Sequence, residues 1–414
     1  MVTILGLGYV GLTTALGLAE MNSKVYGFDS DSNHVARLCN SAVTFKEPYL
    51  HDKLRAYHGT RLIFNMDMRS AIRDSEYIFV CVGTPSEANG SVDLADVKSA
   101  VIDILSYLPH DNKYRLLIIK STVPPNTCKN VIEPLIRDNG YGESAVGIVS
   151  NPEFLRVGFC WEDFITPSKI VIGTNNSTAD EMMTKLYELF HAPIHSMSLS
   201  SAEFSKYLSN IFLASLISFS NEMAFAASIF NDVDVKAAFL ALHADGRLKD
   251  SSISSYVYPG CGFGGYCLPK DIKAFHAALR TQNYDSSLIG SIIEINDQLA
   301  DLYCKKIESI STSESAIGIL GLAFKPDSDD VRETPASRII DALQLAGYKN
   351  IYAYDPVANE TYERAYKHQK IHYSKSAEEL ISAADIIMIT TAWPEFKGLD
   401  FKGKHVIDGR YFIE

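Results

Sequence analysis

A glycine-rich segment that ends in Cys267 combines a candidate nucleophile with a backbone composition that disfavours a helix. Glycine occupies positions 260, 262, 264 and 265, and glycine is among the poorest helix formers. It also lets backbone close on a ligand and supplies positive φ angles. We expect a helix to begin just after the loop, near Asp271. A thiol beside cations or at a helix start has a lowered pKa and acts as a nucleophile. The alternative is a small buried hydrophobe, which is our interpretation of Cys39, Cys81, Cys261 and Cys304.

Lys206 and Asn210 are a second candidate pair, because their i, i+4 spacing places them on one face of a helix that we predict over 202–230. Their neighbours are mostly apolar, and a buried ammonium is costly unless it is paired or functional. Together the two side chains can hydrogen-bond a developing alkoxide, as an oxyanion hole does. The spacing fits equally well a lysine that reaches solvent along its stem.

Two cations mark a third segment, in which Gly321-Leu-Ala-Phe-Lys-Pro326 is followed by acidic residues and Arg332. Lys325 and Arg332 are residue types that suit phosphates. The alternative is a solvated loop with ordinary surface charge.

The first thirty residues carry the spacing of a dinucleotide fingerprint. An aliphatic run over 2–5 leads into Gly6-x-Gly8-x-x-Gly11, then a helical pattern, then a second strand that ends at Asp29. Gly6 permits the tight turn, Gly8 lets backbone approach a pyrophosphate, and Gly11 lets the helix pack on the strand. The helix N-terminus favours phosphates. Asp29 can bind a ribose diol and would repel a 2′-phosphate, so we expect NAD in preference to NADP.

The elements that must hold these residues form an α/β protein with two Rossmann-like, doubly wound parallel sheets joined by an all-helical connector. Ligands in such sheets sit beyond the carboxyl ends of the strands. We expect a dinucleotide-binding domain over 1–199, a helical domain over 200–308 that carries the catalytic loop, and a smaller nucleotide-binding domain over 309–414. The long helix is apolar nearly all round, which is typical of a buried or interface helix, so we expect it to form a dimer interface. Strands are predicted at 2–5, 24–28, 62–64, 77–82, 116–119, 146–149, 170–172, 316–321, 351–354, 386–389 and 405–407.

Composition excludes several classes of protein. The 414 residues carry a formal charge of −12, so nucleic acid is not an expected partner. We find no apolar run of the roughly 18 residues that cross a bilayer and no secretory signal pattern, so we expect no membrane partner. Seven scattered cysteines suggest reduced thiols in a cytoplasm. Zinc-type spacing of Cys and His is not seen, so we expect no metal.

Taken together, these segments resemble the UDP-glucose/GDP-mannose dehydrogenase family over essentially the whole chain. The branch that acts on UDP-glucose is the most similar. The matching motifs are Gly6-x-Gly8-Tyr9-Val10-Gly11, Gly83-Thr84-Pro85, Ser121-Thr122-Val123-Pro124, Asn151-Pro152-Glu153-Phe154-Leu155, Ala202-Glu203-x-x-Lys206-Tyr207-x-x-Asn210, Gly262-Phe-Gly264-Gly265-Tyr266-Cys267-Leu-Pro-Lys270-Asp271, Gly321-Leu-Ala-Phe324-Lys325 and Asp408-Gly409-Arg410.

The resemblance implies a four-electron oxidation of the C6 alcohol of UDP-glucose to a carboxylate by two NAD+, through a thiohemiacetal and a thioester on Cys267. It further implies that Lys206 and Asn210 stabilise oxyanions, while Glu153, Thr122 and Asp271 serve the hydrolytic water. Cofactor contacts are implied for Gly6, Gly8, Tyr9, Val10, Gly11, Asp29, Thr84, Thr122 and Arg332. Nucleotide-sugar contacts are implied for Phe154, Leu155, Lys206, Asn210, Tyr256, Gly264, Phe324, Lys325 and Arg410, and for Arg247 reaching the site of a neighbouring subunit in a homodimer.

Two departures from the family pattern leave the sugar open. Val157 stands where Glu is common, and Leu216 stands where a basic residue is common. The same reaction on GDP-mannose, UDP-N-acetylglucosamine or UDP-N-acetylmannosamine is one alternative. A two-electron hydroxyacid dehydrogenase of related fold is another, although it would need no thiol. A non-catalytic NAD-binding protein is the third, and it would need none of Cys267, Lys206, Asn210 and Glu153.

Overall fold

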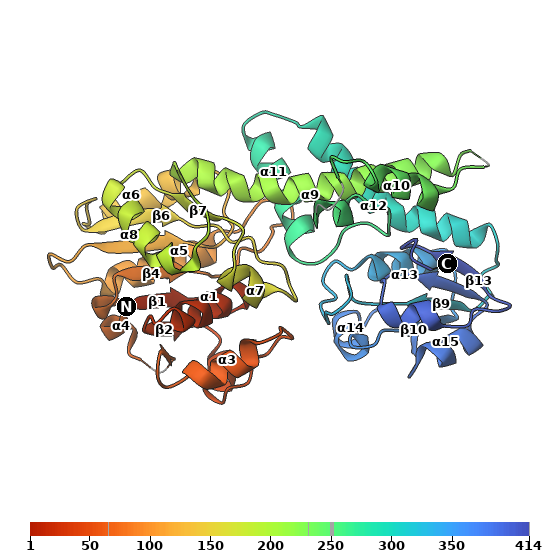
Figure 1. Cartoon of the computed structure of the whole chain (residues 1–414), viewed down its shortest axis with the longest axis horizontal. Helices are drawn as coiled ribbons and strands as arrows, with labels where there is room; N and C mark the ends of the chain where they lie inside the picture. Colours follow the sequence, from red (N-terminus) through yellow and green to blue (C-terminus); the bar gives the residue numbers. More distant parts are fainter. Residues whose placement is uncertain (65, 231, 249–251, 414) are drawn as a thin grey trace. The chain divides into compact units, whose positions relative to one another are not determined.

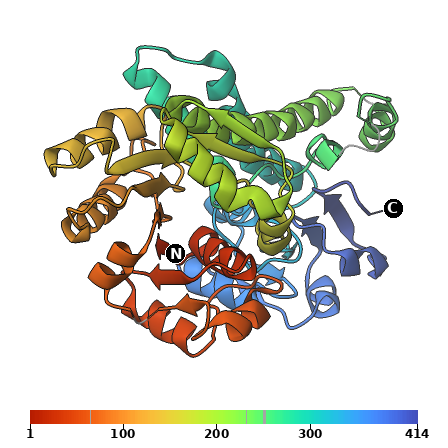
Figure 2. The ribbon, with the colours of Figure 1, turned by 60° about the vertical axis from the view of Figure 1, so that its left-hand side comes forward.

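The computed structural model describes residues 1–64, 66–230, 232–248 and 252–413. Internal contacts divide the chain into two units, Met1–Leu208 and Ser209–Glu414. Each unit is described by itself, and both can be followed by their colours in Figures 1 and 2.

The first unit is built on one eight-stranded sheet with the order β3-β2-β1-β4-β5-β6-β7-β8. Among the described residues, the neighbouring strands of this sheet pair in parallel except β6 and β7, where Ser150 lies opposite Gly173 in an antiparallel contact. The strands are β1 Val2–Leu5, β2 Val25–Phe28, β3 Leu62–Ile63, β4 Tyr77–Val80, β5 Arg115–Ile119, β6 Val146–Ser150, β7 Ile170–Gly173 and β8 Ile194–Met197. The helices are α1 Tyr9–Glu20, α2 Ser32–Cys39, α3 Leu50–Tyr57, α4 Met68–Asp74, α5 Ala95–Tyr107, α6 Glu133–Asp138, α7 Cys160–Ile165 and α8 Ser177–Tyr187, with short helical segments Cys128–Ile132 and Glu188–Phe190.

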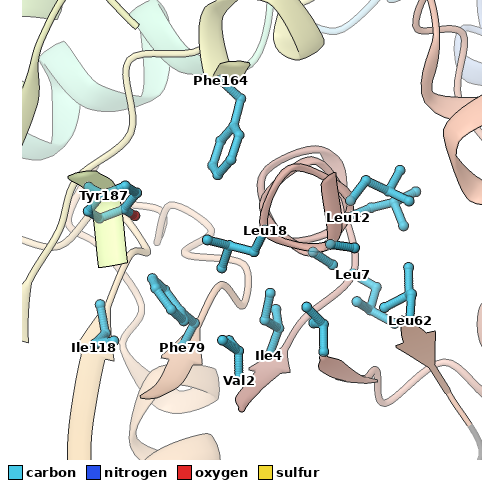
Figure 3. Packing of buried hydrophobic residues seen from close by; sticks show 14 of the residues in the cluster. Val2, Ile4, Leu7, Leu12, Leu18, Leu62, Phe79, Ile118, Phe164 and Tyr187 are labelled. Atoms are coloured by element: carbon cyan, nitrogen blue, oxygen red, sulfur yellow. The ribbon is translucent and has the colours of Figure 1, made fainter. Parts of the chain in front are cut away.

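Helices cover both faces of this sheet, because its central strands are apolar on both sides. One core cluster joins β1 and β4 to α1, α3, α7 and α8, and another joins the opposite faces to α4, α5 and α6. In Figure 3, Val2, Ile4 and Phe79 point from adjacent strands toward α1, and Phe164 of α7 approaches the helix from the other side. Gly17 makes that approach possible, since a Cβ there would lie 2.1 Å from the Phe164 ring.

Helix α9, Leu199–Ala227, is one unbroken helix (Figure 1). Its first turns belong to the first unit and the remainder to the second. Six large apolar side chains are exposed along it, of which Leu208, Phe212, Phe219 and Met223 are spaced four to seven residues apart; the others are Phe204 and Phe225. The predicted helix is therefore confirmed, although it begins and ends about three residues earlier than the pattern suggested.

The second unit continues with helices and ends in a five-stranded parallel sheet with the order β11-β10-β9-β12-β13. Its helices are α10 Val235–His243, α11 Cys267–Thr281, α12 Ser287–Glu308, α13 Pro335–Leu345, α14 Asn359–Ala365 and α15 Ala377–Ala383, with short turns Ser252–Tyr256 and Pro394–Gly398. Its strands are β9 Ile317–Leu320, β10 Ile351–Tyr354, β11 His372–Tyr373, β12 Ile386–Ile389 and β13 His405–Asp408.

The α/β class and both sheets are confirmed, with three corrections. Strands β8 and β11 were not predicted, and the first sheet is not wholly parallel. The helix expected near Asp271 begins four residues earlier, so Cys267 is its first residue. Pro269, the third residue of the helix, is compatible with this start, because the N–H groups of the first turn have no acceptor within the helix.

Candidate functional site

The three glycines of the N-terminal turn differ in whether the surrounding structure requires a residue without a side chain. Gly6 has a φ of +88°, and a Cβ there would lie 2.6 Å from the Cys81 carbonyl oxygen. A Cβ on Gly11 would lie 1.7 Å from the Gly6 oxygen, so glycine is needed where α1 crosses β1. Gly8 differs, because a Cβ there would have nothing within 4 Å. No contact within the protein therefore requires glycine at position 8, which leaves room for a phosphate at the start of α1, beside Tyr9 and Val10.

Asp29 lies at the carboxyl end of β2 beside an open hollow of about 750 Å³, which is lined by several residues between 28 and 40 and by Phe64, Met66 and Asp67. Its carboxylate accepts hydrogen bonds from Leu7 N at 2.7 Å and Asp31 N at 2.9 Å. An ionised carboxylate has about four lone-pair sites, so capacity remains for a ribose diol. Tyr9 stacks on Phe45 with 4.0 Å between ring centres. These features fit an adenosine dinucleotide.

The second cluster is a buried ion pair between Glu153, after β6, and Lys206 on α9. Lys206 Nζ lies 2.8 Å from Glu153 Oε1, and the two side chains are only 4% and 7% exposed. Leu155 N donates to Glu153 Oε2 at 2.6 Å, which folds the Asn-Pro-Glu-Phe-Leu turn around the carboxylate. Burial by itself raises the pKa of Glu153, but Lys206, the Leu155 amide and Lys120 together hold it below its usual value. Glu153 is therefore ionised at neutral pH.

Phe154 and the loop after β5 border this ion pair. The Lys169 ammonium lies 4.2 Å from the centre of the Phe154 ring and that of Lys206 lies at 5.7 Å. Glu203, three residues before Lys206, accepts hydrogen bonds from Asn126 N and Cys128 N at 2.6 and 2.7 Å. The loop that carries half-buried Thr122 is thereby tied to α9.

The third cluster lies at the start of α11. Cys267 is half-buried and is the first residue of α11. One turn later, Asp271 is 1% exposed and accepts from Asn210 Nδ2 at 2.6 Å and from Lys270 Nζ at 2.7 Å. Asn210 keeps a second N–H hydrogen for another acceptor.

The glycines before Cys267 are explained by packing inside the second unit. A Cβ on Gly264 would lie 2.4 Å from the Glu333 carbonyl oxygen, and Gly265, with a φ of +76°, donates to Arg332 O at 2.9 Å. The side chain of Arg410 occupies the space beside Gly260. This loop is therefore fixed against the segments that carry the predicted phosphate-binding cations. A side chain at position 264 would collide with the Glu333 backbone, so only the backbone of Gly264 is available to a ligand.

Those cations are held in defined places. Arg332 makes a two-point contact with Asp330 at 2.8 and 2.6 Å, and its guanidinium lies 4.7 Å from the Tyr266 ring centre. The Lys325 ammonium lies 5.8 Å from the centre of the Phe324 ring.

The first turn of the second sheet resembles that of the first but uses its acid differently. Asp355, at the end of β10, is 2% exposed and accepts from Leu322 N, Ala323 N and Trp393 Nε1 through Oδ2, and from Val357 N and Ala358 N through Oδ1. Groups of the protein itself therefore occupy both oxygens of the carboxylate that corresponds to Asp29.

For the other predicted site residues, the structure gives the position and burial of the side chain. Thr84 is buried just after β4, and Leu155 and Tyr256 are half-buried. Arg247 has a side chain that is 89% exposed and pairs with Asp245 of its own chain at 2.6 Å.

Lys120 was not predicted. It is 5% exposed, ends the apolar run of β5, and donates to the side-chain and backbone oxygens of Asn151 at 3.1 and 3.4 Å. A lysine that directly follows a buried strand was the signal available in the sequence.

Some features are absent from the described residues. They contain no group of His, Cys, Asp or Glu arranged to hold a metal. None of the seven cysteines, all of which lie in the described ranges, is in a disulfide bond. Within the same residues, every helix is too short or too polar to cross a membrane.

Comparison with known proteins covers nearly the whole chain. Family models for the UDP-glucose/GDP-mannose dehydrogenase family match residues 1–191 (NAD binding domain), 200–298 (central domain) and 318–414 (UDP binding domain). A UDP-glucose 6-dehydrogenase of Rickettsia bellii is 35% identical over 97% of this chain and 91% of its own. A UDP-glucose dehydrogenase structure from Pyrobaculum islandicum matches 99% of this chain and 94% of its own, with TM-score 0.92 and 34% identity. The structure of a UDP-D-ManNAc dehydrogenase from Pyrococcus horikoshii matches 100% of this chain and 96% of its own, with TM-score 0.85 and 26% identity.

Proposed function

The chain belongs to the UDP-glucose/GDP-mannose dehydrogenase family, and on that premise we propose that it oxidises the C6 alcohol of UDP-glucose to the carboxylate of UDP-glucuronate through a covalent adduct on Cys267. It is an NAD-dependent dehydrogenase. When bound, NAD+ accepts the hydride in each of the two oxidations.

The C6 alcohol loses a hydride and a proton and becomes an aldehyde. The Cys267 sulfur bonds to the aldehyde carbon and gives a thiohemiacetal. Loss of a second hydride and a second proton gives a thioester, and water cleaves its C–S bond to release the carboxylate and the thiol. Each hard step is thereby divided into easier ones.

Lys206 and Asn210 are proposed to stabilise the negative charge on the C6 oxygen. They are one helical turn apart on α9, and each is aligned by a carboxylate, Lys206 by Glu153 and Asn210 by Asp271. Donors that are aligned in advance need little reorganisation as charge develops.

Glu153, Thr122 and Asp271 are proposed to serve the hydrolytic water. Burial raises the pKa of Glu153, but Lys206, the Leu155 amide and Lys120 together hold it below its usual value. Glu153 is therefore ionised, and an ionised carboxylate can accept the proton of an attacking water.

For the cofactor, we propose that the turn at Gly6, Gly8 and Gly11 binds the pyrophosphate and that Asp29 binds the ribose, with contacts from Tyr9, Val10, Thr84, Thr122 and Arg332. For the nucleotide-sugar, the proposed contacts are Phe154, Leu155, Tyr256, Gly264, Phe324, Lys325 and Arg410. These assignments divide the chain into cofactor, catalytic and UDP-binding domains at 1–199, 200–308 and 309–414.

The observation that best supports the proposal is the position of Cys267 as the first residue of α11, with Asp271 and Lys270 in the turn that follows. The test incubates the purified protein and NAD+ with UDP-glucose, UDP-N-acetylglucosamine, UDP-N-acetylmannosamine and GDP-mannose, following NADH and product. We expect UDP-glucose to be preferred, with two NADH formed per sugar. One NADH per sugar would contradict the four-electron reaction and favour a hydroxyacid-type dehydrogenase. Preference for another sugar would keep the chemistry and correct the substrate.

We also propose a homodimer through the exposed apolar side chains of α9, in which Arg247 reaches the neighbouring site. Large apolar side chains that form a row on one helix are typical of an interface. The free thiols favour a reducing compartment, and we propose the cytoplasm.

Replacing Phe212 and Phe219 together by Asp tests the interface. We expect the dimer to dissociate, because two buried carboxylates without partners are costly. Light scattering after gel filtration measures the mass, and Phe230→Asp, beyond the end of α9, is the control. A double variant that stays dimeric would place the interface elsewhere.

A further inference from the structure

Lys120 is a buried cation that the proposed reaction does not use. Its ammonium contacts the Oδ1 and carbonyl oxygens of Asn151, and Tyr187 donates to the same Oδ1 at 2.6 Å. Asn151 Nδ2 donates to Val171 O at 2.8 Å. Lys120 is therefore anchored to the residue two positions before Glu153.

Lys120 and Glu153 also line the same small cavity, of about 70 Å³. Burial lowers the pKa of Lys120, interaction with Cys81 and with the Glu153 carboxylate acts in the opposite direction, and the charge of Lys206 lowers it further. Two buried lysines, Lys120 and Lys206, thus lie near one buried carboxylate, and the ammonium charge of each lowers the pKa of Glu153.

A second cation beside Glu153 has a chemical use. When Lys206 donates a hydrogen bond to a substrate oxyanion, its positive charge stabilises the Glu153 carboxylate less. Glu153 nevertheless remains buried away from water. A buried carboxylate without compensation takes up a proton, and a protonated Glu153 cannot act as a base.

We propose that Lys120 is a positioning residue that keeps Glu153 ionised and fixed while Lys206 serves the substrate. This inference rests on the proposed function, because it assumes that Glu153 acts as a base in that reaction.

Other ionisable groups surround this set and must be kept unchanged in a test. Cys81, which follows β4, acts on Lys120 and has a pKa raised by burial to about 12. Tyr187 of α8, Asp163 of α7 and Lys169 before β7 line the same cavity as Lys120 and Glu153. Burial, followed by the charge of Lys206, lowers the pKa of Lys169.

The test compares Lys120→Met with Tyr187→Phe, since each variant removes one hydrogen bond to Asn151 Oδ1 but only the first removes a charge. We expect the acid limb of the kcat profile with UDP-glucose to move to higher pH by about 1 in Lys120→Met. We expect KM to change little. Tyr187→Phe should keep the wild-type profile. An unmoved limb in Lys120→Met, or an equal movement in both variants, would overturn the proposal.

Thermal unfolding across pH gives a readout that does not depend on the substrate. In Lys120→Met the loss of stability on acidification below pH 4.5 should be smaller than in the wild type, because the folded-state pKa of Glu153 lies closer to its unfolded value. The same substitution in a Glu153→Gln background should not change this loss. If the wild type does not oxidise UDP-glucose, the proposed function fails while this measurement still decides whether Lys120 and Glu153 are coupled; no coupling would overturn the inference.

Discussion

Cys267→Ser is expected to lower steady-state NADH production from UDP-glucose by on the order of 10³-fold or more, as for the loss of a covalent nucleophile. A serine hydroxyl at the start of α11 has nearly the same size as the thiol but is far less readily ionised. It therefore traps the aldehyde poorly and cannot form the thioester. The measurement is NADH formation together with NAD+ binding, which should be unchanged because the Gly6–Gly11 turn is distant in sequence and lies in the first unit.

Cys261→Ala is the matched control for this experiment. Cys261 lies in the same loop, six residues earlier, but it is buried and its sulfur lies against the carbonyl oxygens of Ile389 and Gly409. This variant should keep most of the activity. Equal losses in both variants would indicate damage to the loop, and full turnover in Cys267→Ser would refute the covalent role.

Lys206→Met is expected to have two separate effects. Removing a preorganised oxyanion donor typically lowers kcat by about 10²–10³-fold. Breaking a buried ion pair costs about 3–5 kcal/mol of stability, because Glu153 would remain buried without its closest partner. Enzyme assays and denaturant unfolding measure the two effects independently.

The double variant Lys206→Met, Glu153→Gln separates stability from catalysis. It removes the uncompensated charge, so it should regain most of the stability but none of the activity. Recovery of activity would exclude Lys206 as the oxyanion donor.

The pH dependence of unfolding should change direction between these proteins. In the wild type the pKa of Glu153 lies below its ordinary value of 4.5, since burial raises it but Lys206, the Leu155 amide and Lys120 together lower it by more. The ion pair therefore contributes fully above pH 4.5 and is lost as the pH falls through the lowered pKa. In Lys206→Met burial dominates and raises that pKa, so the variant should gain stability as the pH falls from neutral toward 4.5. Parallel pH profiles would show that the two groups are not coupled.

Much of the fold could be predicted because its central strands are buried on both faces. Strands such as Ile351–Tyr354 and Ile386–Ile389 are short aliphatic or aromatic runs between helices, and they were predicted to the residue. Strand β11 has only two residues, and β8 has two exposed members. Their formation depends on an adjacent strand, which local sequence does not reveal.

The site residues themselves could largely be predicted from the sequence, whereas the groups that contact them could not. Lys206 and Asn210 could be paired from their spacing, but their partners Glu153 and Asp271 are distant in sequence. Lys120 escaped prediction because a lysine at a strand end is usually solvated, and only the tertiary structure shows that Asn151 and Tyr187 enclose it. The glycines at 260 and 264 suggested room for a ligand, whereas the space beside them is filled by Arg410 and Glu333.

The saturated carboxylate of Asp355 has a consequence for stoichiometry. The two sheets look like repeats of one nucleotide-binding plan, and a naive count would assign a dinucleotide to each. Since both oxygens of Asp355 are already occupied by backbone and indole donors, a ribose diol arriving at the second turn would find no acceptor to replace its water. Equilibrium dialysis with NAD+ should therefore saturate at a single equivalent per polypeptide, leaving the C-terminal half to a nucleotide that is recognised by its phosphates.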